Sequence, residues 1–217
     1  DDPQWLNQIA VKSLSEKDQK LIQYLAKHGH WTPFSHVQIQ MREKVPLFVA
    51  RQRFKHGVGF SPYDEIEFSY NERSGRYVGR DVDFFTPVSW RKQAEDKKQG
   101  SSDETITHIR YWDPIVGPGP DWIELNEELA RQHHDCECIY NSMVNDGVSI
   151  EQARMVLPQS MYTEYYVTGS LAAWARAYKL RIASDAQKEI QDLAKQWDEI
   201  IRSIPEMKHS WEALVGS

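Results

Sequence analysis

Cysteine is scarce in this chain, since only Cys136 and Cys138 occur in 217 residues. Their single-residue spacing inside a helical pattern is unsuited to an unstrained disulfide, and two thiols are too few for a structural zinc site. No activating group accompanies either thiol in the sequence, so a catalytic cysteine is a minor alternative. The pattern therefore excludes a disulfide framework and gives no support to thiol chemistry.

Long apolar runs and an excess of positive charge are also missing. No stretch approaches the roughly 20 apolar residues of a membrane span, and the start, DDPQW, lacks a basic segment followed by an apolar one. The formal net charge of −6 gives no overall attraction to nucleic acid or to anionic lipid. We therefore expect a cytoplasmic protein without a nucleic-acid or membrane partner.

What the chain does contain indicates one globular unit. Aromatic residues make up 12% of it, with eight tryptophans, and charged residues make up 27%. This balance excludes a disordered chain and favours a soluble folded one. No internal repeat or dividing linker is present, so we predict a single domain over residues 1–217.

Hydrophobic periodicity and capping residues predict a mixed architecture. Strands are expected over residues 37–42 and 162–168. Helices are expected over about 13–28, from Pro46, over about 122–143, from Ser149 to near Pro158, over 170–180, and from Ser184 to about 204. The predicted caps are Ser13 and Ser15, with acidic residues three positions on at Glu16 and Asp18, then Ser149 and Ser184, with Gln152 and Gln187 completing capping boxes, and Ser170. The fold class is therefore α+β, with long helices packed around a small, mainly antiparallel sheet.

Two helical faces are expected to be buried. On the helix expected between residues 122 and 143 the face consists of Leu125, Leu129, Cys136, Ile139, Tyr140 and Met143. On the last predicted helix it consists of Ile190, Leu193, Trp197, Ile201 and Ile204.

Two polar segments are candidates for ligand binding. Residues 51–56, RQRFKH, place cationic and amide side chains four apart on a helix, and residues 69–77, SYNERSGRY, form a loop rich in donors with one glycine. Such groups suit a phosphate or a nucleobase edge. A solvated basic helix face and an ordinary turn are the alternative interpretations.

The wider sequence resembles the flavin-dependent thymidylate synthase family. The similar segments, in order, are HGHWTPF at 28–34, PLFVARQ at 46–52, NERSGRY at 71–77, ARMVLP at 153–158, and Leu180-Arg181 followed by SDAQKEI at 184–190. Together they extend over about residues 15 to 205, and the combination is more specific than any single piece. The chain is thus similar to a divergent member of this family.

This resemblance implies a thymidylate synthase-complementing-protein-like fold and a specific reaction. The expected activity converts dUMP to dTMP, with methylenetetrahydrofolate as carbon donor, FAD as cofactor and NADPH as reductant. It also implies a homotetramer in which several subunits build each active site.

The resemblance also implies, position by position, which residues of this chain bind the substrate and the cofactor. The expected dUMP contacts are Gln52, Lys55, Glu72, Arg73, Ser74, Gly75, Arg76, Arg154 and Arg181. The expected FAD contacts are His30, Thr32, Lys55, His56, Gly57, Glu72, Ser170 and Arg176. Arginine forks suit the nucleotide phosphate, and Arg181 is the expected catalytic residue, because a fixed positive charge at the uracil ring stabilises negative charge developing there.

The chain departs from the family pattern in several places. The triplet Arg-His-Arg appears as Lys55-His56-Gly57, and sixteen residues rather than seven separate it from Ser74, which predicts an inserted loop at about 58–68. The family's asparagine and arginine for the flavin are replaced, leaving Ser170 and Arg176 as weaker candidates. Its N-terminal segment is unmatched here, which predicts a truncated or divergent end.

Other interpretations stay open at this point. Arg154 and Arg181 could form ion pairs at helix ends, and His28, His30 and His36 could suggest a metal, but no carboxylate accompanies them, so no metal is expected. At the level of function, the alternatives are a nucleotide-binding protein without synthase activity and a flavoprotein of another reductive function.

Overall fold

The computed structural model describes residues 14–55, 57, 70–72, 82–95 and 101–216. Its helices are α1 (Glu16–Lys27), α2 (Leu47–Arg53), α3 (Leu125–Asn145), α4 (Ile150–Ala153), α5 (Leu171–Arg181), α6 (Lys188–Arg202) and α7 (Pro205–Gly216), with 3-10 turns η2 (Thr32–Ser35) and η3 (Arg154–Val156). Its strands are β1 (Gln38–Pro46), β2 (Tyr70–Glu72), β3 (Trp90–Gln93), β4 (Ser101–Ile106), β5 (His108–Asp113), β6 (Gly117–Glu124) and β7 (Tyr162–Ser170). The predicted α+β class is confirmed.

The central sheet has the order β1-β7-β2 and is antiparallel throughout. β1 and β7 pair along their full length, from Gln38 opposite Ser170 to Pro46 opposite Tyr162. Side chains in β1 alternate from Gln38 to Val45, with Ile39, Met41 and Val45 buried and the residues on the opposite face exposed; only the last residue, Pro46, departs from this by also being buried. This is the period-two pattern that the sequence predicted for a strand with one face on the core.

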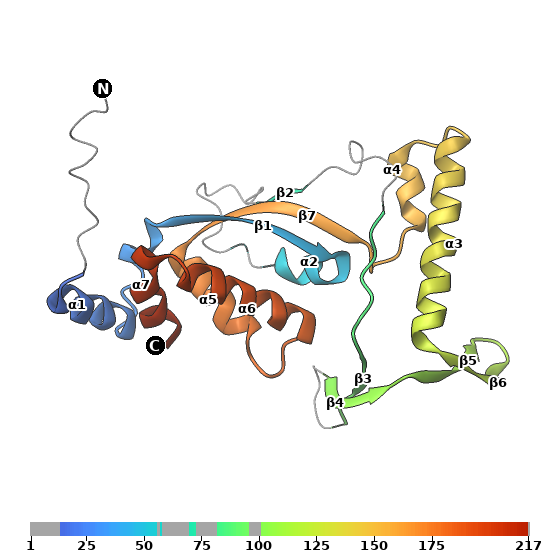
Figure 1. Ribbon diagram of the computed structural model, residues 1–217, viewed down its shortest axis with the longest axis horizontal. Helices are drawn as coiled ribbons and strands as arrows, with labels where there is room; N and C mark the ends of the chain where they lie inside the picture. Colours follow the sequence, from blue (N-terminus) through green and yellow to red (C-terminus); the bar gives the residue numbers. More distant parts are fainter. Residues whose placement is uncertain (1–13, 56, 58–69, 73–81, 96–100, 217) are drawn as a thin grey trace.

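Helices α2, α5 and α6 cover one face of this sheet, and α7 and α1 pack at one end of the helical layer (Figure 1). The layer is filled by large aromatic side chains, because Trp174, Trp197 and Trp211 are all fully buried. Four of the five residues predicted to form the buried face of the last long helix are confirmed, with Ile190, Leu193, Trp197 and Ile201 buried in α6.

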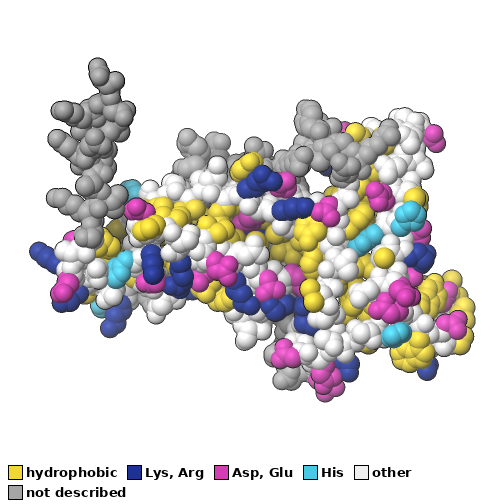
Figure 2. Space-filling view, in the orientation of Figure 1, with side chains coloured by type: hydrophobic (Ala, Val, Ile, Leu, Met, Phe, Trp, Pro, Cys, Tyr) yellow, Lys and Arg dark blue, Asp and Glu magenta, His cyan; other side chains and the backbone are white. Residues whose placement is uncertain are grey.

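At the other end of the sheet, α3 stands beside α4, and two β-ribbons, β3-β4 and β5-β6, extend below it (Figure 1). The β5-β6 ribbon carries exposed apolar side chains: Ile109, Tyr111, Trp112, Ile115, Val116 and Trp122. Figure 2 shows hydrophobic side chains gathered over this ribbon. Neither ribbon was predicted, because their sequences are rich in charge, Gly and Pro and lack a clear period.

Ser15 and Ser170 are confirmed as helix caps, Ser149 is confirmed in position only, Ser184 is wrong, and Ser13 lies outside the described residues. Ser15 and Asp18 form a complete capping box on α1, and the Ser170 hydroxyl accepts the amide N–H of Ala173 on α5. Ser149 is the N-cap residue of α4, as predicted, but its hydroxyl makes no capping hydrogen bond, so the predicted capping box with Gln152 is not formed. Helix α6 begins only after Gln187, since Gln191 binds the carbonyls of Ala183 and Ala186 and holds the preceding residues in a turn.

The predicted face of α3 is only partly correct. Tyr140 is buried, but Ile139 is 51% exposed, and the buried partner on this helix is His133. Helix α3 packs mainly on α4, η3 and β6, so its covered side is narrower than the apolar pattern implied. Helix α7 was not expected, although Pro205 at its start is a typical first residue of a helix.

Candidate functional site

The end of α2 meets the end of α5 through a main-chain contact. The Arg181 guanidinium donates from Nη2 to the carbonyl oxygen of Gln52 at 3.1 Å. Both residues are half-buried. The contact forms because α2 and α5 lie in the same layer under the sheet and both helices end nearby (Figure 1). Two of the predicted dUMP residues are therefore neighbours in the folded chain.

Arg181 retains an unused donor. Its Nε is buried and has no hydrogen-bond partner among the described residues. Burial lowers the pKa of Arg181, and the nearby positive charge of Arg53 lowers it further. The side chain stays cationic near neutral pH, because an arginine pKa begins far above that range. A buried donor on a cation is suited to an electron-rich or anionic ligand oxygen.

A continuous chain of hydrogen bonds leads away from this junction. The Gln52 amide donates to the Gln187 Oε1, and the Gln187 amide donates to the Glu189 Oε2 at 2.9 Å. Arg91 donates to the other oxygen of Glu189 at 2.7 Å and to the Ser101 hydroxyl at 2.7 Å. These hydrogen bonds link α2, the start of α6 and the β3-β4 ribbon, so they fix the positions of these elements around the Arg181–Gln52 contact.

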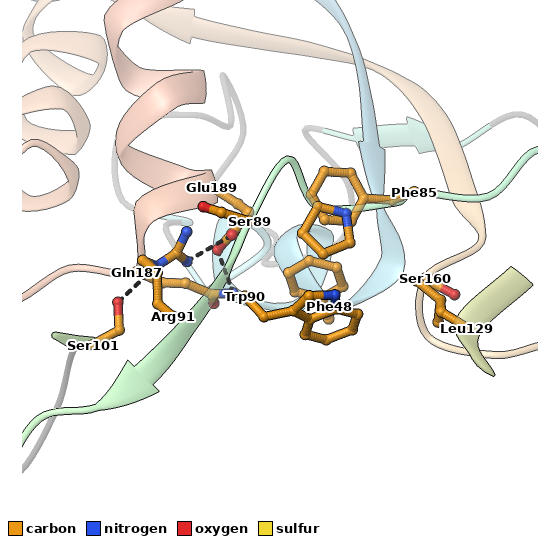
Figure 3. A pocket seen from close by; sticks show the side chains of 11 residues that line it. Phe48, Phe85, Ser89, Trp90, Arg91, Ser101, Leu129, Ser160, Gln187 and Glu189 are labelled. Carbon is orange, nitrogen blue, oxygen red and sulfur yellow. Dashed lines mark hydrogen bonds and ion pairs between the residues drawn. The ribbon is translucent and has the colours of Figure 1, made fainter. Parts of the chain in front are cut away.

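A pocket of about 290 Å³ opens beside this series of hydrogen bonds. Its lining residues are Phe48, Phe85, Pro87, Ser89, Trp90, Arg91, Ser101, Leu129, Ser160, Gln187 and Glu189. Figure 3 shows two unlike sides: Arg91, Glu189 and Ser101 on one, and the rings of Phe48 and Phe85 with Leu129 on the other. Its size is near the lower end of the range for small-molecule sites, and its aromatic and polar sides suit a ring-containing ligand.

The far wall of the pocket ends at a histidine–serine pair. His133 Nε2 lies 2.7 Å from the Ser160 hydroxyl, and the Phe84 ring stacks on the imidazole with centroids 4.5 Å apart. Burial lowers the pKa of His133, so the imidazole is neutral near pH 7. This pair holds α3 against the segment that precedes β7.

The remaining candidates on the α2 side lie further out. Lys55 and Gly57 follow α2 and are exposed. Glu72 is the last residue of β2, at the edge of the sheet next to β7. The candidates His56, Arg73, Ser74, Gly75 and Arg76, and the expected inserted loop at 58–68, lie outside the described residues.

Arg154 lies in a different part of the subunit. It begins η3, directly after α4, and its side chain is exposed. Helix α4 packs against α3, away from α5 and α6 (Figure 1). Within one subunit, the described residues do not bring Arg154 together with Arg181.

The flavin candidates are also dispersed. His30 and Thr32 are exposed in the turn between α1 and β1, where the Tyr24 ring stacks on His30 with centroids 6.3 Å apart. Arg176 is exposed on α5. Ser170 is buried, and its hydroxyl is used as the cap of α5, which argues against a flavin contact. The described residues of one subunit therefore do not form a complete flavin pocket.

Other reactive groups give no second site. Cys136 and Cys138 are free thiols, and Cys138 Sγ lies 3.6 Å from His134 Nε2 on an exposed part of α3. Among the residues that the structure describes, no group of three His, Cys, Asp or Glu side chains is arranged to hold a metal ion. No helix in the described part of the chain has the length and apolar character needed to cross a membrane.

Four residues of the hydrogen-bond series, Gln187, Glu189, Arg91 and Ser101, were not predicted as site residues. Gln187 and Glu189 belong to the segment at 184–190 that carried the family resemblance, so that signal was available. Arg91 falls in the aperiodic stretch between Gly57 and Glu104, where no motif marks it. Only its pairing with Glu189, 98 residues away in the chain, gives it a place in the site.

Comparison with known sequences gives a consistent result. The sequence model of the family described as thymidylate synthase complementing protein matches residues 2–205. A flavin-dependent thymidylate synthase of Thermus thermophilus is 34% identical over 186 residues, which cover 86% of this chain and 60% of that protein. The flavin-dependent thymidylate synthase of Thermosipho africanus is 36% identical over 182 residues, covering 82% and 69%. The chain thus spans somewhat less than two thirds of the Thermus relative.

Solved structures share the same fold. A UMP/dUMP methylase, PolB from Streptomyces cacaoi, bound with 5-Br UMP, superposes with a TM-score of 0.66. The superposition covers 96% of this chain and 87% of that chain, at 21% sequence identity. The same methylase bound with 5-Br dUMP gives a TM-score of 0.65 at 23% identity. At these identities the likeness establishes the fold, and it confirms the predicted arrangement of long helices around a small antiparallel sheet.

Proposed function

The chain belongs to the thymidylate synthase complementing protein family, and we propose that it is a flavin-dependent thymidylate synthase that methylates dUMP to dTMP. The observation that carries this proposal is the junction of Arg181 with Gln52, in which a half-buried cation keeps one donor unused. Such a group suits a uracil ring, which presents carbonyl oxygens and becomes electron-rich during attack on a one-carbon unit.

The roles of the individual residues follow from this assignment. Arg181 stabilises negative charge on the uracil ring, and Gln52 and Lys55 hold the nucleotide from the end of α2. Glu72, the 73–76 segment and Arg154 complete the dUMP site, with the two arginines Arg76 and Arg154 directed to the phosphate. A monophosphate carries about two negative charges near neutral pH, so more than one guanidinium is needed to neutralise it.

The site is shared between subunits of a homotetramer in this proposal. The support is geometric: Arg154 is exposed at the α4 end of the subunit, while Arg181 lies under the sheet, and the flavin candidates His30 and Thr32 lie at the α1 end. A second copy can present its Arg154 and its η2 turn to the Arg181 of the first. Residues that are separated within one subunit then belong to one site.

A bound flavin supplies hydride transfer, and NADPH and methylenetetrahydrofolate serve as reductant and carbon donor. The chain itself supplies position and charge: Arg181 and Gln52 orient the uracil, and the arginines hold the phosphate. His30, Thr32, Lys55, His56, Gly57, Glu72 and Arg176 are the residues assigned to the flavin, while Ser170 is engaged as a helix cap.

The test is an assay of dTMP formation from dUMP with purified protein, FAD, NADPH and methylenetetrahydrofolate. We expect dTMP only when all four are present, detected by chromatography of the nucleotides. Binding of dUMP without turnover would instead indicate a nucleotide-binding protein. Oxidation of NADPH that does not depend on dUMP would indicate a flavoprotein of another function. Either result contradicts the proposal.

A further inference from the structure

A fully buried ion pair lies directly behind the candidate site. Arg53 has no exposed surface, and Glu43 is only 4% exposed. Arg53 Nε lies 3.3 Å from the Glu43 carboxylate, whose other oxygen accepts a hydrogen bond from the Tyr165 hydroxyl at 2.6 Å. The Arg53 guanidinium also lies over two neighbouring indole rings, with its Cζ 5.0 Å from the centroid of Trp174 and 4.9 Å from that of Trp197.

Stability alone does not account for such a cluster. Removing two charges from water is costly, and apolar side chains of similar volume often serve as well or better at such positions. A buried ion pair can instead select one arrangement of the elements it joins, since each partner has strict geometric demands. Here the joined elements are β1, β7, α2, α5 and α6, which carry Glu43, Tyr165, Arg53, Trp174 and Trp197 respectively.

The cluster is connected to Arg181 through the main chain. Arg53 is the last residue of α2, and the carbonyl that accepts from Arg181 belongs to Gln52, so it is part of the peptide group that joins Gln52 to Arg53. The last four carbonyls of a helix have no partner inside it and are free to tilt. Because the Arg53 side chain is held in place, the peptide group between Gln52 and Arg53 has a fixed orientation. The oxygen of this peptide group accepts the hydrogen bond from Arg181.

Helix α5 provides a second connection. Trp174 packs on the Arg53 guanidinium and donates from its indole N–H to the Ile39 carbonyl at 3.2 Å. Arg181 ends the same helix two turns later. Arg53 therefore locates both the acceptor of Arg181 and the helix from which Arg181 projects.

We propose that Arg53, neutralised by Glu43, is a positioning residue that sets the orientation of Arg181 toward the uracil nucleotide. Its catalytic consequence rests on the proposed function, whereas its structural consequence for Arg181 does not. The charge balance is consistent with this role, because the positive charge of Arg53 acts on Arg181.

The test replaces the pair by apolar residues, in the double variant Glu43→Met with Arg53→Met. The matched control is Arg202→Met, which removes an arginine that pairs with Asp198 elsewhere on α6 and lies outside the candidate site. Two measurements are made on both proteins and on the parent: kcat and KM for dUMP, and the NMR signal of the Arg181 Nε–H in protein labelled at arginine nitrogen. The Arg181 signal is assigned with Arg181→Lys.

In the double variant we expect kcat to fall about 100-fold, as a displacement of about 1 Å at a catalytic group does. The Arg181 Nε–H signal should shift and exchange faster with water. The control should keep the parent kcat and the parent signal. A folded double variant with the parent kcat and signal would overturn the proposal, as would a lost kcat with an unchanged signal.

If the double variant does not fold, Arg53→Lys takes its place, because lysine keeps the charge but cannot present a planar group over the two rings. We expect a smaller loss of kcat and the same movement of the Arg181 signal, and an unmoved signal overturns the proposal. If the parent makes no dTMP, the proposed function fails, and the NMR signal still decides whether Arg53 positions Arg181.

Discussion

Arg181 is the residue on which the proposed chemistry depends. Its guanidinium is half-buried, its Nη2 donates to the Gln52 carbonyl, and its Nε is buried without a partner among the described residues. A donor held in this way needs no reorganisation when charge develops on a ligand, which is the condition for electrostatic catalysis. We therefore expect Arg181 to contribute more to the transition state than to dUMP binding alone.

Arg181→Ala should lower kcat for dTMP formation by at least about 100-fold, the usual cost of losing a preorganised donor. KM for dUMP should change less, because the phosphate contacts remain. Steady-state kinetics of the variant measure both constants. Lys179→Ala is the matched control, since Lys179 is exposed on the same helix and should retain parent values. An Arg181→Ala enzyme with parent kcat removes the catalytic assignment.

His133 is predicted to make stability depend on pH. Its folded-state pKa is lowered by burial below the ordinary 6.5, so the unfolded chain takes up the proton first as pH falls. Stability should be unaffected above pH 6.5 and should decrease below it, by up to about 1.4 kcal/mol for each unit of pKa difference. His133→Gln, which can still bond Ser160, should show a flatter profile in urea unfolding at several pH values.

The exposed neighbour His134 offers the control for this measurement. His134→Gln should retain the pH profile of the parent, because that side chain is solvated on α3. Equal profiles for the parent and His133→Gln would refute the assignment.

Single residues of the site were predictable only where a motif marked them. Gln52 and Arg181 belong to segments similar to the family, and the structure brings them together. Arg91 carries no such mark, and Arg53 belongs to the polar segment 51–56, but its burial was not predicted. Each gains its place from a carboxylate on another element, Glu189 for Arg91 and Glu43 for Arg53. A pairing across long sequence separation leaves no local pattern, so sequence analysis could not find it.

At the scale of elements, periodicity was reliable where one face of an element packs on the core. The alternation in β1 and the apolar stripe in α6 predicted their buried sides because both elements have one continuous partner layer. Helix α3 has no such layer within the subunit, and its Ile139 is exposed. The two β-ribbons were missed because a two-stranded ribbon buries little apolar surface. Its strands therefore need no regular alternation of apolar and polar residues that a sequence analysis could detect.

Helix α7 is the element whose packing gives the sharpest stability test. Trp211 is fully buried, its indole N–H donates to Asp198 at 2.6 Å, and its ring packs near Tyr178. Trp211→Ala should lower the free energy of unfolding by about 3–5 kcal/mol, the usual cost of emptying a site of this size. Trp211→Phe, which keeps a ring but loses the hydrogen bond, should cost less. A loss below about 1 kcal/mol for Trp211→Ala in urea titration would mean that α7 is not docked as described.

At the scale of the whole molecule, the proposed site needs more than one chain. Arg154 belongs to the α3-α4 end, His30 and Thr32 to the α1 end, and Arg181 to the helical layer between them (Figure 1). If these residues act as proposed, the described part of a single subunit does not bring them to one site that holds dUMP and the flavin. The central claim is therefore that Arg154 of one subunit and Arg181 of another act on the same dUMP.

Mixing two inactive variants tests this claim most directly. Arg154→Ala and Arg181→Ala are each expected to be nearly inactive alone, and co-expression of the two should form mixed tetramers. If the two arginines come from different subunits, about one quarter of the sites regain both, and about one quarter of the parent dTMP-forming activity should return. Mixed tetramers without any recovered activity would contradict the claim, because they would place both arginines of each site on a single chain.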